Sequence, residues 1–557
     1  MKTRSSDSVL TRMERRVFVF LAIAALSYLS VSALAETLGY RPIDGKGNNV
    51  DHMEWGSAGV QLLRGPSGAH YGDGISSLAG ASRPSPRAIS NALFNQTGLI
   101  FSSVGHSDYI WTWGQFLDHD VGLTPGENEP VPIPVPSGDP FFDPFNTGTQ
   151  VILFSRSVFD PLTGGVTPRQ QINQITAYID GSNVYGVNVG TDTDRPGWLR
   201  TRQGGRLKVT TTSVGDLLPY NDGTVFNVGT PEQPDNSTLL FVAGDVRANE
   251  QPTLAAMHTL FVREHNYQAS RIAAANPGLD DDAIYQRARR MVIAEIQAIT
   301  YEEFIPALLG KNALRQDRGY DPEVNAGIAQ VFSTAAYRLG HTLLSPEIQH
   351  LDENGNSLPG GPLQLRDVFF RGAPPVLEAE GIEPILRGLA AQKSQELDNR
   401  VIDDVRNFLF GPPGAGGLDL ISLNIQRGRD HGLPDFNTAR AEFGLPPKDF
   451  SQITYDRNLA AKLARLYNND AGDIDLFVGL LVERDMPGMI VGETLRAILM
   501  DQFERSRCGD RFFYTRYLSS EELKQVRAMR LSDIIKRNTT IANIQSDVFY
   551  VQGRGRN

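Results

Sequence analysis

A histidine between two aspartates is the most conspicuous chemical feature of this chain, in the stretch W-G-Q-F-L-D-H-D. His119 lies between Asp118 and Asp120, and Gln115 precedes it by one helical turn. If this stretch is helical, Gln115 shares a face with His119, and the two aspartates point about 100° to either side. An imidazole that can exchange a proton near neutral pH and two carboxylates would then serve separate partners. Taken alone, the pattern also fits a solvated helix end.

The sequence has nine histidines, and several of them have ordinary explanations. His258 and His265 are seven residues apart on one face of a strongly helical stretch. A shared metal is conceivable there, but we expect buried core histidines. The H-E-x-x-H pattern of zinc proteases is absent. Outside turn-like and polar stretches, the histidines that remain for imidazole chemistry are His119, His341 and His431.

Composition describes a large globular protein without a nucleic-acid partner. The 557 residues are 40% hydrophobic, enough to bury a sizeable core, and carry a net charge of -11. Phosphate binding requires an excess of Lys and Arg, which this chain does not have. Its one cysteine, Cys508, excludes an internal disulfide, a thiolate zinc site, an iron–sulfur site and a C-x-x-C-H attachment. Stability must come from core burial, a metal or a cofactor.

The first 35 residues have the order of a secretory signal. Basic residues precede a long apolar run that ends in A-L-A at 33–35. We predict cleavage after Ala35, which makes the protein secreted or periplasmic, with no stable membrane span after cleavage. An uncleaved membrane anchor is the alternative, because the apolar run is nearly long enough to cross a bilayer. Residues 36–557 are predicted to form one large domain, since no charged or low-complexity linker divides them.

The elements that must position these side chains are predicted to be mainly α-helical, with few short strands. Residues 36–110 are rich in Gly, Ser, Pro and Asn and predict a long irregular N-terminal wrapping segment. The prolines of 129–145 require an extended course. Strand-like alternation is confined to short pieces such as 207–212. Apolar residues at helical spacing predict helices over 253–272, 281–304, 326–344, 376–392, 395–408, 435–442, 456–468, 490–505 and 519–535.

Four more sequence blocks change the weight of the D-H-D stretch. They are T-A-Y-I-D-G-S-N-V-Y-G at 176–186, A-G-D-V-R-A-N-E-Q-P at 243–252, A-A-Y-R-L-G-H-T-L at 335–343 and L-N-I-Q-R-G-R-D-H-G-L-P-D-F-N at 423–437. In order and spacing, the five blocks resemble the animal-type haem peroxidases of the peroxidase–cyclooxygenase superfamily, and peroxidasin-like members most. The resemblance covers essentially residues 38–550. The missing disulfides favour a bacterial member. The resemblance implies a single large helical domain that binds haem.

The resemblance implies roles for residues on the distal side of that haem. His119 corresponds to the distal histidine, which takes a proton from hydrogen peroxide and returns it to the departing oxygen. Arg247 corresponds to the cation that stabilises negative charge on that oxygen, and Gln115 to the residue that holds the distal water or a halide. Asp118 and Glu250 match two carboxylates that form ester bonds to the haem in this family.

Other matched residues would lie on the proximal side. His341 corresponds to the ligand of the haem iron, and Asn424 to the partner of its second ring nitrogen. A neutral amide there leaves the imidazole less anionic than a carboxylate would. Arg338 and Arg427 would face the haem propionates, which suit planar guanidinium groups. His431 lies in a loop signature of the family, and we expect a structural role for it.

A calcium site is also implied, by Thr176, Tyr178, Asp180 and Ser182. They occupy alternate positions of one segment and offer hydroxyl, carboxylate and main-chain oxygens, which suit a hard cation. Asp120 would complete the ligand shell, so the ion would fix the helix that bears His119. The segment pattern alone is weak and gains its value from the other blocks.

The resemblance predicts an enzyme that reduces hydrogen peroxide to water. It would then oxidise halides or thiocyanate by two electrons, or phenolic donors by one; the sequence does not rank these donors. A fatty-acid dioxygenase of the same superfamily would use a tyrosine three residues before the proximal histidine, but Arg338 occupies that position and Tyr337 is offset by one. A non-catalytic, calcium-stabilised adhesion module is the third alternative. It has no need for the paired acid/base group and cation, His119 and Arg247.

Overall fold

A computed structural model describes residues 39–229, 233–371 and 373–552 of the chain. The predicted signal, residues 1–35, lies outside the described residues. Within the described ranges, no helix is both long enough and apolar enough to cross a membrane.

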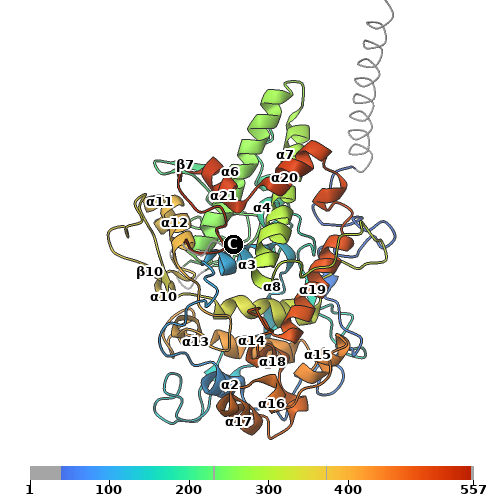
Figure 1. Cartoon of the computed structure of the whole chain (residues 1–557), viewed down its shortest axis with the longest axis vertical. Coiled ribbons are helices and arrows are strands. Elements are labelled where there is room, and N and C mark those ends of the chain that lie inside the picture. Colours follow the sequence, from blue (N-terminus) through green and yellow to red (C-terminus); the bar gives the residue numbers. More distant parts are fainter. Residues whose placement is uncertain (1–38, 230–232, 372, 553–557) are drawn as a thin grey trace, which may run out of the picture.

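Two long helices, α6 (Pro252–Ala275) and α7 (Asp281–Ile299), pack side by side in the upper half of the molecule (Figure 1). Each starts at a side-chain cap: Gln251 accepts hydrogen bonds from two amides of α6, and Asp280 accepts one from α7. Such caps satisfy amides that have no partner within the helix. These helices confirm the predictions for 253–272 and, with η1 (Thr300–Phe304), for 281–304.

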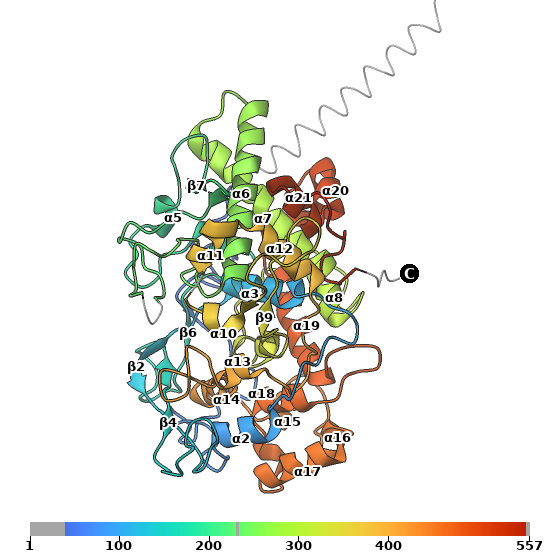
Figure 2. The same ribbon diagram turned by 90° about the vertical axis from the view of Figure 1, so that its left-hand side faces the viewer.

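Helix α3 (Tyr109–Val121), which carries the D-H-D stretch, lies in the middle of the molecule. It packs against α6, and both Figure 1 and Figure 2 place it between the α6/α7 pair and the lower helices. Ten of its 13 residues are buried, so the solvated helix end is wrong for this stretch. The lower helices include α14 (Leu420–Asp430), which carries Asn424 and Arg427.

Shorter helices complete the α-helical structure. Their bounds are α2 (Pro86–Leu93), α4 (Ser182–Tyr185), α5 (Arg195–Trp198), α8 (Ile305–Leu309), α10 (Leu365–Val368), α13 (Asp403–Arg406), α15 (Phe436–Glu442), α16 (Phe450–Ile453), α17 (Arg457–Leu466), α18 (Leu476–Val482), α19 (Glu493–Cys508), η3 (Ala471–Asp473) and η4 (Tyr514–Arg516). Helices α15, α17 and α19 confirm three of the predicted ranges. The structure is mainly α, as predicted.

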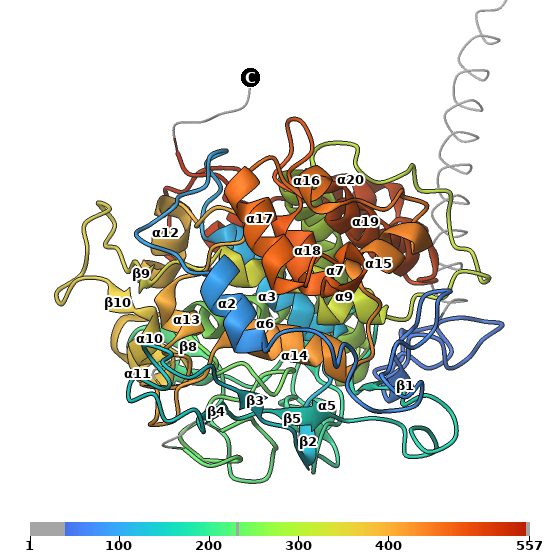
Figure 3. The same cartoon turned by 90° about the horizontal axis from the view of Figure 1, so that it is seen from below.

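The strands are short and form only two-stranded antiparallel pairs in the described part of the chain. Figure 3 shows β2 to β5 gathered on one side of the helical core. The pairs are β1 (Val60–Gln61) with β6 (Ile172–Asn173), β2 (Gly126–Pro130) with β5 (Ser155–Ser157), β3 (Ile133–Pro134) with β4 (Val151–Ile152), β7 (Thr210–Thr212) with β8 (Gly215–Leu217), and β9 (Glu347–Ile348) with β10 (Leu363–Gln364). The irregular wrapping segment is confirmed, although α2 interrupts it; the predicted extended course of 129–145 holds only up to residue 135, because turns follow from residue 136 on.

Four predicted helices are wrong in extent. The range 376–392 is divided into α11 (Ala373–Glu380) and α12 (Glu383–Ala391), because Gly381 adopts φ +76°. In 395–408 only α13 is helical, since Gln395 and Val401 are bridged to extended segments. The range 519–535 divides at Met529 into α20 (Ser520–Ala528) and α21 (Leu531–Asn538). Range 326–344 becomes α9 (Gln330–Thr334) and the 3-10 helix η2 (Ala336–Thr342).

Candidate functional site

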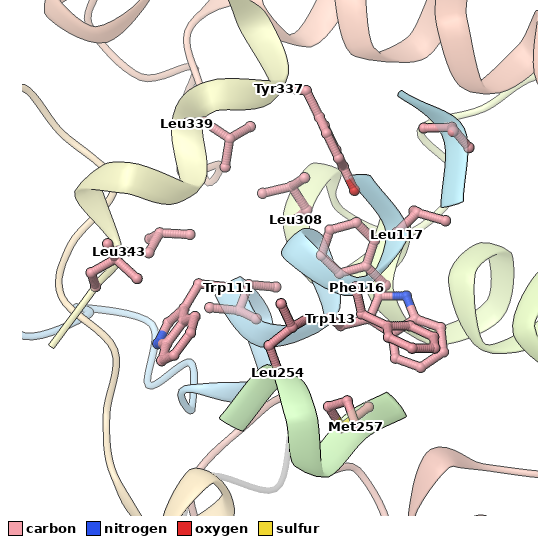
Figure 4. Close-up of a cluster of buried hydrophobic side chains, with 14 of the residues drawn as sticks. Trp111, Trp113, Phe116, Leu117, Leu254, Met257, Leu308, Tyr337, Leu339 and Leu343 are labelled. Carbon is pink, nitrogen blue, oxygen red and sulfur yellow. The ribbon is translucent and has the colours of Figure 1, made fainter. Parts of the chain in front are cut away.

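The two histidines of interest lie on elements that face each other in the core. His119 is on α3 and His341 on η2, and these two elements are in contact. Figure 4 shows Trp111 and Phe116 of α3 in one hydrophobic cluster with Leu339 of η2. Blocks that are more than 200 residues apart in sequence therefore meet around one site.

Four of the predicted residues are among the positions of α3 and η2 that are not buried, whereas His119 is buried. In α3 only Gly114, Gln115 and Asp118 are not buried, and in η2 only Arg338, Gly340 and His341 are not. Both elements lie deep in the molecule. The side chain of Asp118 is 37% accessible, although burial raises its pKa. We infer from these unburied positions that a cavity lies between α3 and η2.

His119 has a carboxylate near each ring nitrogen. Nδ1 lies 3.4 Å from Oδ1 of Asp245, and Nε2 lies 3.6 Å from Oε2 of Glu250. Burial and the charge of Arg247 lower the pKa of His119 well below its usual value, although Asp245 acts in the opposite direction. The imidazole is therefore neutral at physiological pH and able to accept a proton.

Arg247 is held beside His119 by Asp245. Its Nε and Nη2 donate to the two oxygens of that carboxylate at 2.9 and 2.8 Å, and Nη2 also donates to the carbonyl of Gly122, after α3. Burial opposes the charge of both partners, but their mutual attraction prevails: the pKa of Arg247 is raised and that of Asp245 is well below its usual value. A fixed cation and a fixed anion thus adjoin the imidazole.

Gln115, Asp118 and Glu250 surround the same space. Gln115 accepts a hydrogen bond from Gln251 at 3.0 Å and donates to Glu250. Burial raises the pKa of Glu250 to about 7, against the attraction of Arg247. Asp118 lies 3.7 Å from Arg247 and also feels the charge of Arg338 on η2, so it lies between the elements that carry the two histidines.

His341 has a neutral partner. The amide nitrogen of Asn424 lies 2.7 Å from its Nδ1, and the amide oxygen accepts a hydrogen bond from Arg338 at 2.9 Å. Among the described residues, Nε2 of His341 has no hydrogen-bond partner. Burial and the charge of Arg338 lower the pKa of His341 to about 3. Burial and Arg427 lower the pKa of Arg338 to about 10.

The R-G-R-D-H-G block is mostly structural. Nη1 of Arg427 donates to Ser155, Ser157 and Asp430, and its guanidinium lies over the ring of Phe154. His431 is buried and bonds to Thr334, Gln330 and Ser157. Its predicted structural role agrees with these contacts, because both ring nitrogens are used within the protein.

A second cluster, of buried oxygens, adjoins the C-terminal end of α3. Contacts join four of the five residues predicted to bind calcium, namely Asp120, Thr176, Asp180 and Ser182. Thr176 donates to Asp180 at 2.9 Å, and Ser182 donates to the carbonyl of Asp120 at 2.7 Å. Gly181 adopts φ +70° in this turn, which glycine does without strain.

The electrostatics of this oxygen cluster suit a cation. Burial, and the repulsion from Asp180, raise the pKa of Asp120 to about 8; burial raises that of Asp180 to about 6. Oδ2 of Asp180 is buried and has no partner among the described residues. Because the hydroxyl of Tyr178 donates to the carbonyl of Trp55, Tyr178 could offer a cation only its main-chain oxygen. Two carboxylates with hydroxyl and carbonyl oxygens form a hard donor set.

Sequence reasoning missed one residue of the distal region, Asp245. Asp245 lies in the A-G-D-V-R block, two residues before Arg247, and this spacing from a predicted cation was the available signal. His258 is a buried core histidine, as expected, but it lies edge-on to Phe116 with its ring 6.4 Å from that of His119. His265 is also buried, and it bonds to Tyr185 and Gly205.

Comparisons with known proteins agree with this arrangement. Residues 40–549 match the family model described as animal haem peroxidase. Peroxinectin A of Dictyostelium discoideum is 36% identical over 93% of this chain and 97% of its own length. The mouse peroxidasin homolog is 36% identical over 92% of this chain, which spans 37% of that larger protein. The chain therefore belongs to the animal haem peroxidase family.

Solved structures extend the likeness to the fold. Peroxidase A from Dictyostelium discoideum superposes with a TM-score of 0.83 at 35% identity, and the match covers 92% of this chain and 99% of that one. A fatty acid alpha-dioxygenase from Arabidopsis thaliana superposes with a TM-score of 0.72 at 20% identity, over 93% of this chain and 84% of that one. At that identity the second likeness shows the fold alone.

Proposed function

We propose that this protein is a secreted peroxidase that reduces hydrogen peroxide and oxidises small anionic donors, halides or thiocyanate, or phenolic donors. The single observation that carries the proposal is the neutral imidazole of His119 with the cation of Arg247 beside it, on a helix that contacts the element carrying His341. A proton acceptor next to a fixed positive charge is what heterolysis of a peroxide bond requires.

The residues present fit a haem. The inferred cavity adjoins α3 and η2, Nε2 of His341 would be free to coordinate iron, and Arg338 would offer a cation for a propionate. A bound haem supplies the redox chemistry. If Nε2 of His341 held the iron, the ring proton would lie on Nδ1 and would need the oxygen of Asn424 as its acceptor; a propionate that attracted Arg338 would free this oxygen. Asp118 and Glu250 are the carboxyls available for ester links to the haem.

On the distal side each residue has a separate task. His119 accepts a proton from hydrogen peroxide at Nε2 and later donates it to the departing oxygen. Arg247 stabilises the negative charge that develops on that oxygen. Gln115, which borders the cavity, positions water or a small anion. Arg247 would attract an anionic donor, whereas ionised Asp118 and Glu250 would repel it. The protonation of Glu250 therefore affects donor binding.

Calcium binding to the oxygen cluster would neutralise Asp120 and Asp180. It would also fix the end of α3, because Asp120 directly follows His119. The sequence of basic, apolar and small residues before Ala35 supports export, where the protein meets calcium at high concentration.

The test is a stopped-flow measurement of the haem-loaded protein with hydrogen peroxide and bromide. We expect a Soret band that changes on addition of peroxide, and a rate constant that falls by about 100-fold or more in His119→Ala. His70→Ala, which removes a histidine distant in sequence and bonded to Ser67, serves as the control. An unchanged rate in His119→Ala would remove this residue from the reaction.

A further inference from the structure

Asp245 is a buried carboxylate that lies between the two distal groups. It is 3% exposed, and its Oδ1 is the atom nearest to Nδ1 of His119, at 3.4 Å. Nδ1 itself is buried and makes no hydrogen bond in the described part of the chain. A buried imidazole nitrogen without a partner loses hydration without compensation, so a slight approach of the two groups would be favourable.

The same carboxylate also holds Arg247. It accepts from Nε and Nη2 of the guanidinium, and from the main-chain amide of Arg247 at 2.8 Å. This parallel pair of charged hydrogen bonds defines the plane and the direction of the guanidinium. Asp245 is therefore the one described side chain that approaches both His119 and Arg247 within 3.5 Å.

The position of Asp245 is tied to α3 through Asn183. The amide of Asp245 donates to the carbonyl of Asn183 at 3.2 Å, and the side-chain amide of Asn183 donates to the carbonyl of Phe116 at 2.7 Å. Phe116 lies less than one turn before His119 on α3. The carboxylate and the imidazole are thus connected by a short path of main-chain contacts, which limits their relative movement.

We propose that Asp245 is a positioning residue that keeps the proton of His119 on Nδ1 and directs Arg247 toward the same cavity. Resting on the proposed function, this assigns the reactive tautomer: Nε2, on the other side of the ring, keeps a free lone pair for the proton of peroxide. Glu250 is the competing acceptor, 3.6 Å from Nε2. Asp245 stays ionised, because Arg247 holds its pKa well below the usual range. Burial raises the pKa of Glu250, so this carboxyl is more readily protonated.

The tautomer can be measured directly. Histidine labelled with ¹⁵N in the haem-loaded, diamagnetic ferrous carbonyl form gives two-bond proton–nitrogen correlations at fixed pH. The signals of His119 are identified by their loss in His119→Gln. In the wild type we expect a protonated Nδ1 and an unprotonated Nε2. The opposite tautomer in the wild type would overturn the proposal, whether or not any variant folds.

Two substitutions of Asp245 should change the tautomer of His119 and the rate with peroxide to different extents. Asp245→Ala removes the acceptor, so His119 should lose its preference for the Nδ1–H tautomer, and the rate constant with peroxide should fall roughly 100-fold. Asp245→Asn keeps an oxygen where Arg247 donates two hydrogen bonds, so the tautomer should be retained and the rate should fall only about tenfold. An unchanged tautomer in Asp245→Ala would overturn the proposal.

Asp475→Ala is the matched control. Asp475 makes the same two hydrogen bonds with Arg429, at 2.9 and 2.8 Å, away from both histidines. It should destabilise the fold similarly but leave the tautomer of His119 unchanged and the peroxide rate within about twofold. A wild type that does not react with peroxide would refute the proposed function alone, because the nitrogen shifts still report on Asp245.

Discussion

The two histidines of the site, His119 and His341, have opposite surroundings. Carboxylates lie within 3.6 Å of both ring nitrogens of His119, whereas His341 faces the neutral amide of Asn424 and the cation Arg338. Burial keeps both rings neutral. The difference teaches that the anionic partners surround the ring proposed to hold and release a proton. The ring proposed as the iron ligand has a partner that donates little charge.

Removal of His341 should have the largest effect on this comparison. We expect His341→Ala to lose the Soret band and at least about 100-fold in haem affinity, because the coordinating nitrogen is gone. His119→Ala should keep the Soret band, since the distal ring does not coordinate iron. Haem titration followed by absorbance measures both. Retention of haem by His341→Ala and its loss from His119→Ala would reverse the assignment of the two sides.

Removal of calcium should affect the distal side more than the proximal side. Asp120 adjoins His119, and its carboxylate repels that of Asp180 when no cation is present. With calcium at 1,000 times its dissociation constant, we expect chelation to lower the free energy of unfolding by about 4 kcal/mol. Calorimetry with and without a chelator measures this. In Asp180→Ala the chelator should have no effect, and a wild type that is equally insensitive would contradict the calcium site.

Asn424→Asp should make the proximal side resemble the distal side. A carboxylate next to Nδ1 of His341 increases the negative character of the ligand and stabilises ferric haem. We expect the ferric/ferrous potential to fall by roughly 60 mV, which corresponds to a tenfold change in equilibrium constant for one electron. Spectroelectrochemical titration measures the potential. An unchanged potential would show that the residue at 424 does not act on the ligand.

The smallest expected effect is on the pH dependence of the stability of the haem-free protein. Burial raises the pKa of Glu250 from an ordinary 4.5 to about 7. Its contribution to the free energy of unfolding is therefore present below pH 4.5 and is lost as pH rises toward 7. Glu250→Gln removes this loss and should stabilise the haem-free protein at pH 8, relative to pH 5, by roughly 1–2 kcal/mol. Urea unfolding at the two pH values measures it. Glu127→Gln, at an exposed strand position, should show no such difference.

Sequence reasoning identified the separate motifs but not all the contacts between them. The D-H-D stretch, Arg247 and His341 were found because each lies in a block of recognisable spacing. Asp245 was missed because its partner His119 is 126 residues earlier, and only folding brings their atoms to 3.4 Å. The roles assigned to these residues remain proposals.

Helix ends were predicted less well than helix positions, for local reasons. Apolar periodicity continues across Gly381, but the positive φ of this glycine ends α11. Residues around Val401 have helical spacing and yet pair with the backbone of Asn95, because a partner segment offers its hydrogen bonds. A sequence pattern reports which residues are buried, and it does not report which segment lies opposite them.

Asp118, His119 and Asp120 occupy consecutive positions on α3. Asp118 faces the cavity, His119 lies beside Asp245, and Asp120 belongs to the oxygen cluster. A one-residue insertion or deletion upstream in this helix would turn all three by about 100° at once. A mutation of that kind would therefore disturb the proposed haem site and the proposed calcium site together.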